Sequence, residues 1–237
     1  MTSKWVVTAA HCIVSQVSTS ELMFVNWLMT SGPHFNIISQ GSLEIRLGEH
    51  RRSVTSDSII TKDFSVDYIL KHPSYGSPQQ HSNDIAMVRL AEEADLSVYT
   101  PACLPDSNED FTGQMALLTG WGATSEGGAV ADILQELDNL PIVSDDSCSS
   151  SIDSFPDYDF SGSVTSDMLC AGGEEGKDWC IGDSGGPLVV EDNSTSQKTL
   201  VGVVSWGIGC AREGLPGIYA EVSSKLRNYS YLTMNLN

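Results

Sequence analysis

The segment from Asp178 to Pro187 constrains this 237-residue chain more than any other part of it. Ser184 lies there between Gly-Asp and Gly-Gly, and glycines permit a tight backbone turn, so we expect an outward-facing hydroxyl with neighbouring N–H groups converging on one point. A hydroxyl is a poor nucleophile at neutral pH until a base removes its proton. The sequence offers His11 as such a base and Asp84 as a carboxylate to orient it.

Four short motifs occur in order along the chain and make this interpretation specific, since a lone Gly-x-Ser-x-Gly would be weak evidence. With them, the region from Lys4 to about Tyr229 closely resembles the chymotrypsin and trypsin serine endopeptidases. The motifs are Thr8-Ala9-Ala10-His11-Cys12, Asn83-Asp84-Ile85-Ala86, Gly182-Asp183-Ser184-Gly185-Gly186-Pro187 and Val204-Ser205-Trp206-Gly207.

The resemblance implies a catalytic role for each motif. Ser184 would be the nucleophile, His11 its general base, and Asp84 the buried acceptor that holds the imidazole. The N–H groups of Gly182 and Ser184 would form the oxyanion hole. Each residue alone also has an ordinary structural explanation, such as a half-buried histidine or a turn-capping aspartate. The order of the motifs favours the catalytic interpretation.

The same resemblance implies an all-β fold with two antiparallel six-stranded β-barrels and a short C-terminal helix. Residues 1–237 would form one peptidase domain. It would contain a partial N-terminal barrel that lacks its opening strands (1–103), a crossing segment (104–116) and a C-terminal barrel (117–237). Alternating apolar residues independently predict a strand at Leu43–Leu47, and a second strand is predicted at Val66–Pro73, where the proline ends it.

Residues 14–40 have no counterpart in the family. His11 and Asp84 are 73 positions apart, and without this segment the spacing falls to about 46, close to the family value of about 45. We consider two explanations, a retained intron translated in frame and a genuine surface insertion, which loops accept at modest entropic cost.

The activation segment that precedes the histidine motif in the family is also missing from this sequence. In the family, the amino terminus released by activation pairs with the residue that corresponds to Asp183 and shapes the oxyanion hole. We therefore expect this chain as written to be zymogen-like or inactive. Two alternatives to a secreted peptidase remain: a binding or regulatory homologue without turnover and, if Met1 is the true start, an intracellular interaction module.

The residues of the specificity pocket are implied by position. Asp178 matches the pocket base of trypsin-like members, and Gly207 and Gly217 match small wall residues, so cleavage after Arg or Lys is the leading expectation. Trp179 departs from the usual small residue and could narrow the pocket or cover Asp178. The backbone of Ser205, Trp206 and Gly207 would pair with the substrate as an added strand.

Six cysteines suit an oxidising compartment. The family pattern pairs Cys148 with Cys170 and Cys180 with Cys210. Cys12 and Cys103 are left over, because their family partners lie in regions that this sequence lacks. Ala116 and Val190 occupy positions of a further family disulfide, and a packed apolar contact is expected in its place. An extracellular location follows from the family and the cysteines.

The formal charge of −19 disfavours nucleic acid and anionic membranes as partners. No run of 18 apolar residues predicts a membrane span. The expected partners are protein or peptide substrates and protein protease inhibitors. No cofactor and no catalytic metal are expected. Calcium is the alternative, because Glu49 and Asp63 lie near the loop that binds calcium in some relatives, although few acidic residues line up there.

Overall fold

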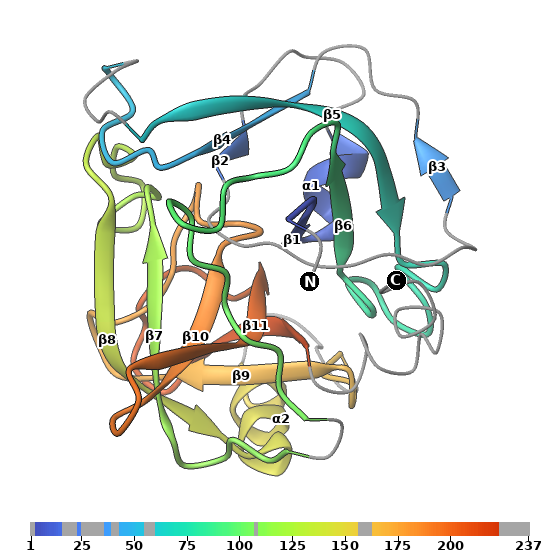
Figure 1. The fold of residues 1–237 in the computed structure, drawn as a ribbon. Helices are drawn as coiled ribbons and strands as arrows, with labels where there is room; N and C mark the ends of the chain where they lie inside the picture. The colour runs from blue at the N-terminus through green and yellow to red at the C-terminus, as the bar shows by residue number, and fades with distance from the viewer. Residues whose placement is uncertain are drawn as a thin grey trace.

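The computed structural model shows a protein built mainly of β-strands, which form two sheets packed side by side (Figure 1). The described residues are 3–15, 23–24, 36–38, 43–54, 60–106, 109–155 and 163–222. The expected C-terminal helix would begin beyond residue 222 and lies outside the described residues, as does most of the segment 14–40.

The C-terminal half forms a closed antiparallel barrel with the strand order β10-β11-β12-β9-β8-β7, which closes where β10 pairs with β7. This confirms the prediction of a closed C-terminal barrel, and the first strand of the barrel begins at Met115. Its strands are β7 (Met115–Gly120), β8 (Gln135–Val143), β9 (Met168–Gly172), β10 (Pro187–Asp192), β11 (Gln197–Trp206) and β12 (Pro216–Glu221).

The N-terminal half forms a sheet with the order β1-β6-β5-β4-β2, and β3 pairs separately with β5. The described strands of this sheet do not close into a barrel, in agreement with the prediction of a partial one. The strands are β1 (Trp5–Thr8), β2 (Met23–Phe24), β3 (Asn36–Ile38), β4 (Glu44–Leu47), β5 (Lys62–Lys71) and β6 (Ala86–Leu90).

Two of these strands come from the segment 14–40, which the sequence indicates to be an insertion or a retained intron. The backbone of β2 pairs with β4 in parallel, and the backbone of β3 pairs with β5 in antiparallel fashion. The segment 14–40 therefore contributes backbone pairing to the first sheet.

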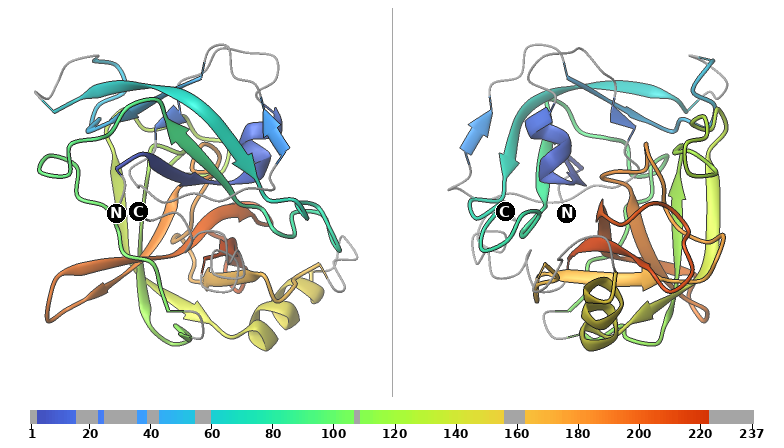
Figure 2. Two further views of the ribbon diagram at one scale, coloured as in Figure 1. Left: turned by 45° about the vertical axis from the view of Figure 1, so that its right-hand side comes forward. Right: turned by 180° about the vertical axis from the view of Figure 1, so that it is seen from behind.

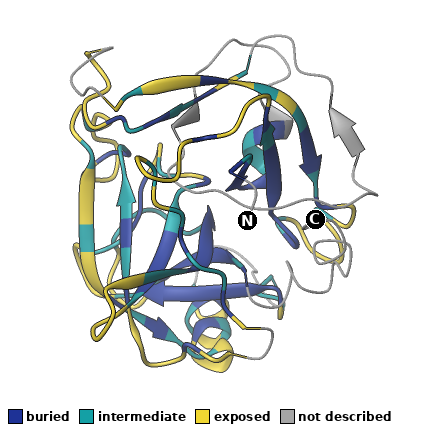
Figure 3. Cartoon of the chain, viewed as in Figure 1, coloured by how far each residue is buried: buried dark blue, intermediate teal, exposed yellow. Residues whose placement is uncertain are grey.

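An apolar core joins the two sheets. One cluster of buried residues contains Trp5, Val7 and Met87 from the first sheet together with Leu200 and Val203 from the barrel. Burying such a side chain contributes about 1.5–3 kcal/mol. Figure 3 shows the buried residues concentrated on β6, β9 and β11, whereas β8 is largely exposed. The sheets are therefore held against each other by packing along their shared face.

Among the described residues, two short helices accompany the sheets, and Figure 2 shows them from two further sides. The helix α1 (Ala10–Ser15) follows β1, and α2 (Asp145–Asp153) packs on β9. Ser144 caps α2 by accepting a hydrogen bond from the Ser147 amide. A side-chain oxygen at this position satisfies one of the amide groups left open at a helix start.

The covalent links agree with expectation. Disulfides join Cys148 to Cys170 and Cys180 to Cys210. Neither Cys12 nor Cys103 forms a disulfide with a described residue. Ala116 and Val190 face each other across β7 and β10 and are both buried, which confirms the expected apolar contact.

We predict that Leu188→Ala in β10 lowers the free energy of unfolding by about 2–5 kcal/mol, because its fully buried side chain fills the barrel core. The matched control is Met115→Ala in β7, whose side chain is 56% exposed. That control should change the stability by less than about 0.5 kcal/mol. Chemical denaturation measures both, and equal losses would contradict the assignment of Leu188 to the core.

Candidate active site

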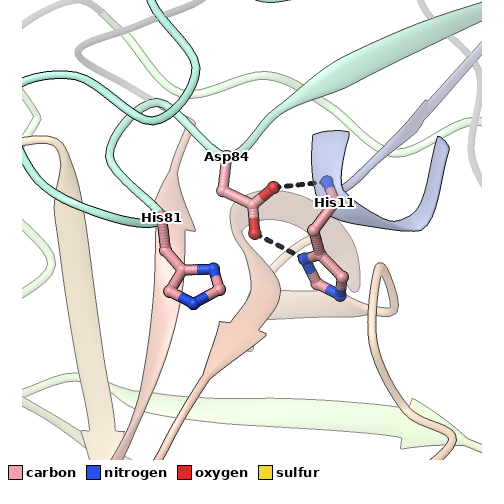
Figure 4. A group of neighbouring side chains, drawn as sticks. All are labelled: His11, His81 and Asp84. Carbon is pink, nitrogen blue, oxygen red and sulfur yellow. Dashed lines mark hydrogen bonds and ion pairs between the residues drawn. The ribbon is translucent and has the colours of Figure 1, made fainter. Parts of the chain in front are cut away.

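The site begins with a histidine and an aspartate from distant parts of the first sheet. His11 lies in α1, and Asp84 lies just before β6. The His11 backbone amide donates to Asp84 Oδ1 at 2.8 Å, and His11 Nδ1 lies 2.6 Å from Asp84 Oδ2 (Figure 4). The Asp84 side chain is fully buried, and 23% of the His11 side chain is exposed. One carboxylate thus holds both the backbone and the ring of the histidine.

A second donor to this carboxylate comes from the barrel. The Ser205 hydroxyl, at the end of β11, donates to Asp84 Oδ2 at 2.6 Å, and both groups are buried. Sequence reasoning placed Ser205 only among the residues that pair with substrate, and it missed this contact. The available signal was a polar side chain at the end of a buried apolar strand, where it needs a partner.

The electrostatics of the pair make the imidazole of His11 a stronger base. Burial lowers the pKa of His11, but the hydrogen bonds to Asp84 and Cys12 outweigh it and raise the pKa above the ordinary value of 6.5. An imidazolium formed during a reaction would therefore be stabilised here. Cys12 Sγ lies 3.5 Å from His11 Nε2, a neighbour that the sequence did not predict.

The glycine-rich loop presents Ser184 on the surface. Ser184 is exposed, and Gly182 and Gly185 have φ angles of +100° and +78°, a region that favours glycine. Neither the Gly182 nor the Ser184 amide hydrogen-bonds to another described residue. Two amides are therefore open beside an exposed hydroxyl.

The two halves of the site approach closely through Gly185. A Cβ atom at this position would overlap the Thr8 hydroxyl and lie 3.2 Å from Cys12 Sγ. The residue after Ser184 therefore packs against residues that flank His11. No hydrogen bond joins the Ser184 hydroxyl to the His11 ring in the described part of the chain.

Asp183 turns away from Ser184 and into the protein. Its Oδ1 accepts from the Gly122 amide at 2.7 Å and its Oδ2 from the Cys180 amide at 3.0 Å. Burial raises the pKa of this carboxyl above its ordinary value. Two backbone amides thus bind the Asp183 carboxylate, which in the family pairs with the amino terminus released by activation.

The predicted pocket residues lie together, but the indole of Trp179 occupies the space between the walls. A Cβ at Gly207 would lie 3.0 Å from Trp179 Cζ2, and a Cβ at Gly217 would overlap Trp179 and lie 2.5 Å from Asp178 Oδ1. Trp179 is buried, and its Nε1 has no hydrogen-bond partner among the described residues. The Trp179 indole therefore fills the predicted specificity pocket through packing contacts, without a hydrogen bond to another described residue.

Asp178 lies next to this indole, and both side chains border Gly217. Its carboxylate accepts hydrogen bonds from the amides of Trp179 at 2.8 Å and Ala211 at 3.1 Å. Burial raises its pKa from 3.8 to about 6, although the two amide donors oppose the shift. At neutral pH the carboxylate is therefore mainly charged.

A second histidine near Asp84 was not predicted. The His81 ring is stacked on Trp206 with ring centroids 6.1 Å apart, and it lies perpendicular to the His11 ring at 6.3 Å. Its Nδ1 is buried and has no hydrogen-bond partner in the described structure. Figure 4 shows His81 beside the Asp84 carboxylate. No sequence pattern marks a histidine three residues before the aspartate.

The two acids considered for calcium, Glu49 and Asp63, both pair with Arg46. Its Nε lies 2.5 Å from Asp63 Oδ1, and its Nη1 lies 3.4 Å from Glu49 Oε2. A single guanidinium thus pairs with both carboxylates and balances one of their two charges.

A closed barrel beside a second β-sheet, with a histidine–aspartate pair facing a glycine-rich serine loop, defines the class of serine hydrolases built on two β-barrels. The family model described as Trypsin matches residues 1–228. The chain belongs to the trypsin family of serine proteases.

Individual relatives agree with this assignment. Trypsin-1 of Salmo salar is 38% identical over 220 residues, which cover 92% of this chain and 72% of that protein. Trypsin II-P29 of Gallus gallus is 37% identical over 93% of this chain and 72% of its own length. The clotting factor G beta subunit of Tachypleus tridentatus is 33% identical over 92% of this chain, which spans 64% of that protein.

We predict that Ser205→Ala lowers the free energy of unfolding by about 1.5–3 kcal/mol, because it removes a hydrogen bond to a buried charge. The matched control is Ser194→Ala, whose hydroxyl donates to Asp192 at the same 2.6 Å but in an exposed position. The control substitution should lower the free energy of unfolding by less than about 1 kcal/mol. Thermal or chemical unfolding of both variants checks this, and a loss no larger for Ser205→Ala would contradict the buried contact.

Proposed function

We propose that this protein is a serine endopeptidase that uses His11, Asp84 and Ser184 as its catalytic triad. The observation that carries the proposal is the double hydrogen bond between His11 and the buried Asp84, made next to the loop of Ser184. The family assignment supports the same reaction class.

The mechanism follows from the roles of these groups. Neutral His11 accepts the Ser184 proton as the serine oxygen attacks the peptide carbonyl, and it then returns the proton to the leaving amine. Water hydrolyses the acyl-enzyme by the reverse sequence. The carboxylate of Asp84, supported by Ser205, stabilises the imidazolium that forms in each step.

The oxyanion would be held by the Gly182 and Ser184 amides, which have no competing acceptor among the described residues. Losing one such donor costs roughly 3 kcal/mol of barrier in enzymes of this kind. The positive φ of Gly182 directs this peptide and excludes most other residues there.

For specificity we propose cleavage after Arg or Lys once the Trp179 indole leaves the pocket. The Asp178 carboxylate supplies the charge that selects a basic side chain. The buried and unpartnered Trp179 Nε1 carries a desolvation cost of about 1–3 kcal/mol, so displacement of the indole into water recovers part of the cost of opening. Trp179 therefore controls access to Asp178.

The proposed setting is extracellular, with proteins or peptides as substrates and protein protease inhibitors as further partners. The two disulfides fit an oxidising compartment. Among the described residues, no helix combines the length and apolar character needed to cross a membrane.

The alternative is a zymogen-like or inactive homologue that binds other proteins without turnover. The filled pocket is the observation that favours it, because Trp179 lies where a substrate side chain would enter. Labelling of the serine separates the two proposals, since a fluorophosphonate reacts with an activated hydroxyl without needing a long side chain in the pocket.

We predict that a small fluorophosphonate labels the wild-type chain and that Ser184→Ala abolishes the labelling. Asp84→Asn should slow it by up to about 10⁴-fold, because the imidazole loses its orienting acceptor. Ser194→Ala is the control and should react like the wild type. A folded wild type that does not react, or labelling that survives in Ser184→Ala, would overturn the proposed triad.

We predict that Trp179→Ser increases the affinity for a small aromatic amidine at least about tenfold, because the cation gains access to Asp178. Fluorescence on binding of aminobenzamidine measures this without requiring catalysis. The affinity should fall as the pH decreases through the pKa of Asp178, at about 6 or lower, since protonation removes the counter-charge.

The control for this experiment is Ile181→Ala, which removes a 68% exposed side chain from the same loop and should leave amidine affinity unchanged. Unaltered affinity in Trp179→Ser would show that the indole is no barrier. Binding that does not weaken at low pH would exclude Asp178 as the counter-charge.

A further inference from the structure

Three potential metal ligands converge around the Asp84 carboxylate. His11, His81 and Asp84 each offer one ligand atom, and these atoms all lie within 4.8 Å of one another. Figure 4 shows the Asp84 carboxylate between the two imidazole rings. The first two residues are half-buried and the third is buried, so an ion could reach the cluster from the solvent side.

The His81 ring has an unused binding capacity at this position. Its Nδ1 is buried and lacks a hydrogen-bond partner in the described structure, although most buried polar atoms have one. Simple packing of the ring against Trp206 accounts for its orientation but leaves this nitrogen unsatisfied. A bound cation would satisfy it.

The loop that carries His81 is held in place. His81 and Asn83 both have left-handed backbone conformations, with φ angles of 66° and 54°. The Ser82 amide donates to the Gln79 carbonyl at 3.0 Å, and the Asn83 side chain donates to the Ser77 carbonyl at 2.9 Å. The ring is therefore presented by a fixed turn, which reduces the entropy lost when a ligand binds.

The chemistry of the donors selects the ion. Two imidazoles and one carboxylate suit Zn²⁺, whereas Ca²⁺ and Mg²⁺ require mainly oxygen ligands. Zinc bonds of about 2.0–2.2 Å in tetrahedral geometry place ligand atoms roughly 3.3 Å apart. Since no pair here exceeds 4.8 Å, movements of about 1.5 Å or less would assemble the site. Water can supply the fourth ligand.

We propose that His11, His81 and Asp84 form an inhibitory site for Zn²⁺. Coordination replaces the hydrogen bond between His11 Nδ1 and Asp84 with bonds to the ion, and the proton that Nδ1 donated to the carboxylate is released to solvent or moves to Nε2. An imidazole turned and held in this way no longer accepts a proton from Ser184. Binding of the ion is independent of the proposed function, whereas the inhibition rests on it.

The first measurement is binding. Untagged wild-type protein is titrated with Zn²⁺ by calorimetry, and Co²⁺ is added separately to look for the absorption bands of a tetrahedral site. We expect one ion per chain. His81→Leu should weaken Zn²⁺ binding at least about tenfold, because a direct ligand is lost. The matched control is His50→Leu at an exposed histidine, which should bind like the wild type.

The second measurement is inhibition, with the fluorophosphonate labelling rate of each variant compared with its own metal-free rate. Zn²⁺ should slow labelling of the wild type and of His50→Leu, and a chelator should restore it. His81→Leu should need at least about tenfold more Zn²⁺ for the same effect. This ratio does not depend on how the substitution alters the basal rate.

The outcomes separate the two proposals. Equal Zn²⁺ affinity in wild type and His81→Leu, or no binding at all, overturns the metal site whatever the labelling shows. Labelling that proceeds unchanged with Zn²⁺ bound overturns the inhibitory role and leaves the peptidase proposal standing. Zn²⁺ binding that depends on His81, in a folded protein that is never labelled, supports the metal site and contradicts the peptidase proposal.

Discussion

The site depends on one buried carboxylate and the three hydrogen bonds that it accepts. Asp84 is fully buried and is bound by the amide and ring of His11 and by the hydroxyl of Ser205. A buried charge costs several kcal/mol unless donors compensate it. Because the donors come from α1 and from β11, the carboxylate is satisfied only when the first sheet and the barrel are in their observed arrangement. The need to satisfy this buried charge therefore fixes the position of the first sheet relative to the barrel.

Close approach at this junction requires a residue without a side chain. Gly185 packs its backbone against Thr8 and Cys12 while its amide donates to the Val204 carbonyl at 2.9 Å. Any Cβ there would push the serine loop away from α1, and its positive φ would also strain other residues. The apolar core between the sheets stabilises their association, and Gly185 determines how closely the serine loop approaches α1.

Much of this arrangement could be predicted either from local sequence patterns or from the resemblance to the family. Alternating apolar residues mark the strands, the two disulfides follow the family pattern, and the apolar pair Ala116 and Val190 indicates a packed contact. The hydrogen bond from Ser205 to Asp84 could not be predicted, because it joins residues 121 positions apart on different sheets. The orientations of Trp179 and His81 depend on three-dimensional neighbours that no motif specifies.

Trp179 and His81 share a physical property with other parts of the site. Thr8, His81, Trp179 and Tyr219 each bury a side-chain polar atom that has no hydrogen-bond partner among the described residues. Such groups are costly in a stable interior, and they lie here beside the serine loop, the aspartate and the pocket. A ligand that pairs with one of them recovers that cost on binding. These polar atoms without hydrogen-bond partners thus lie where substrate or a cation would bind, or where the Trp179 indole would move. The disulfides and the apolar core, in contrast, hold the surrounding barrel fixed.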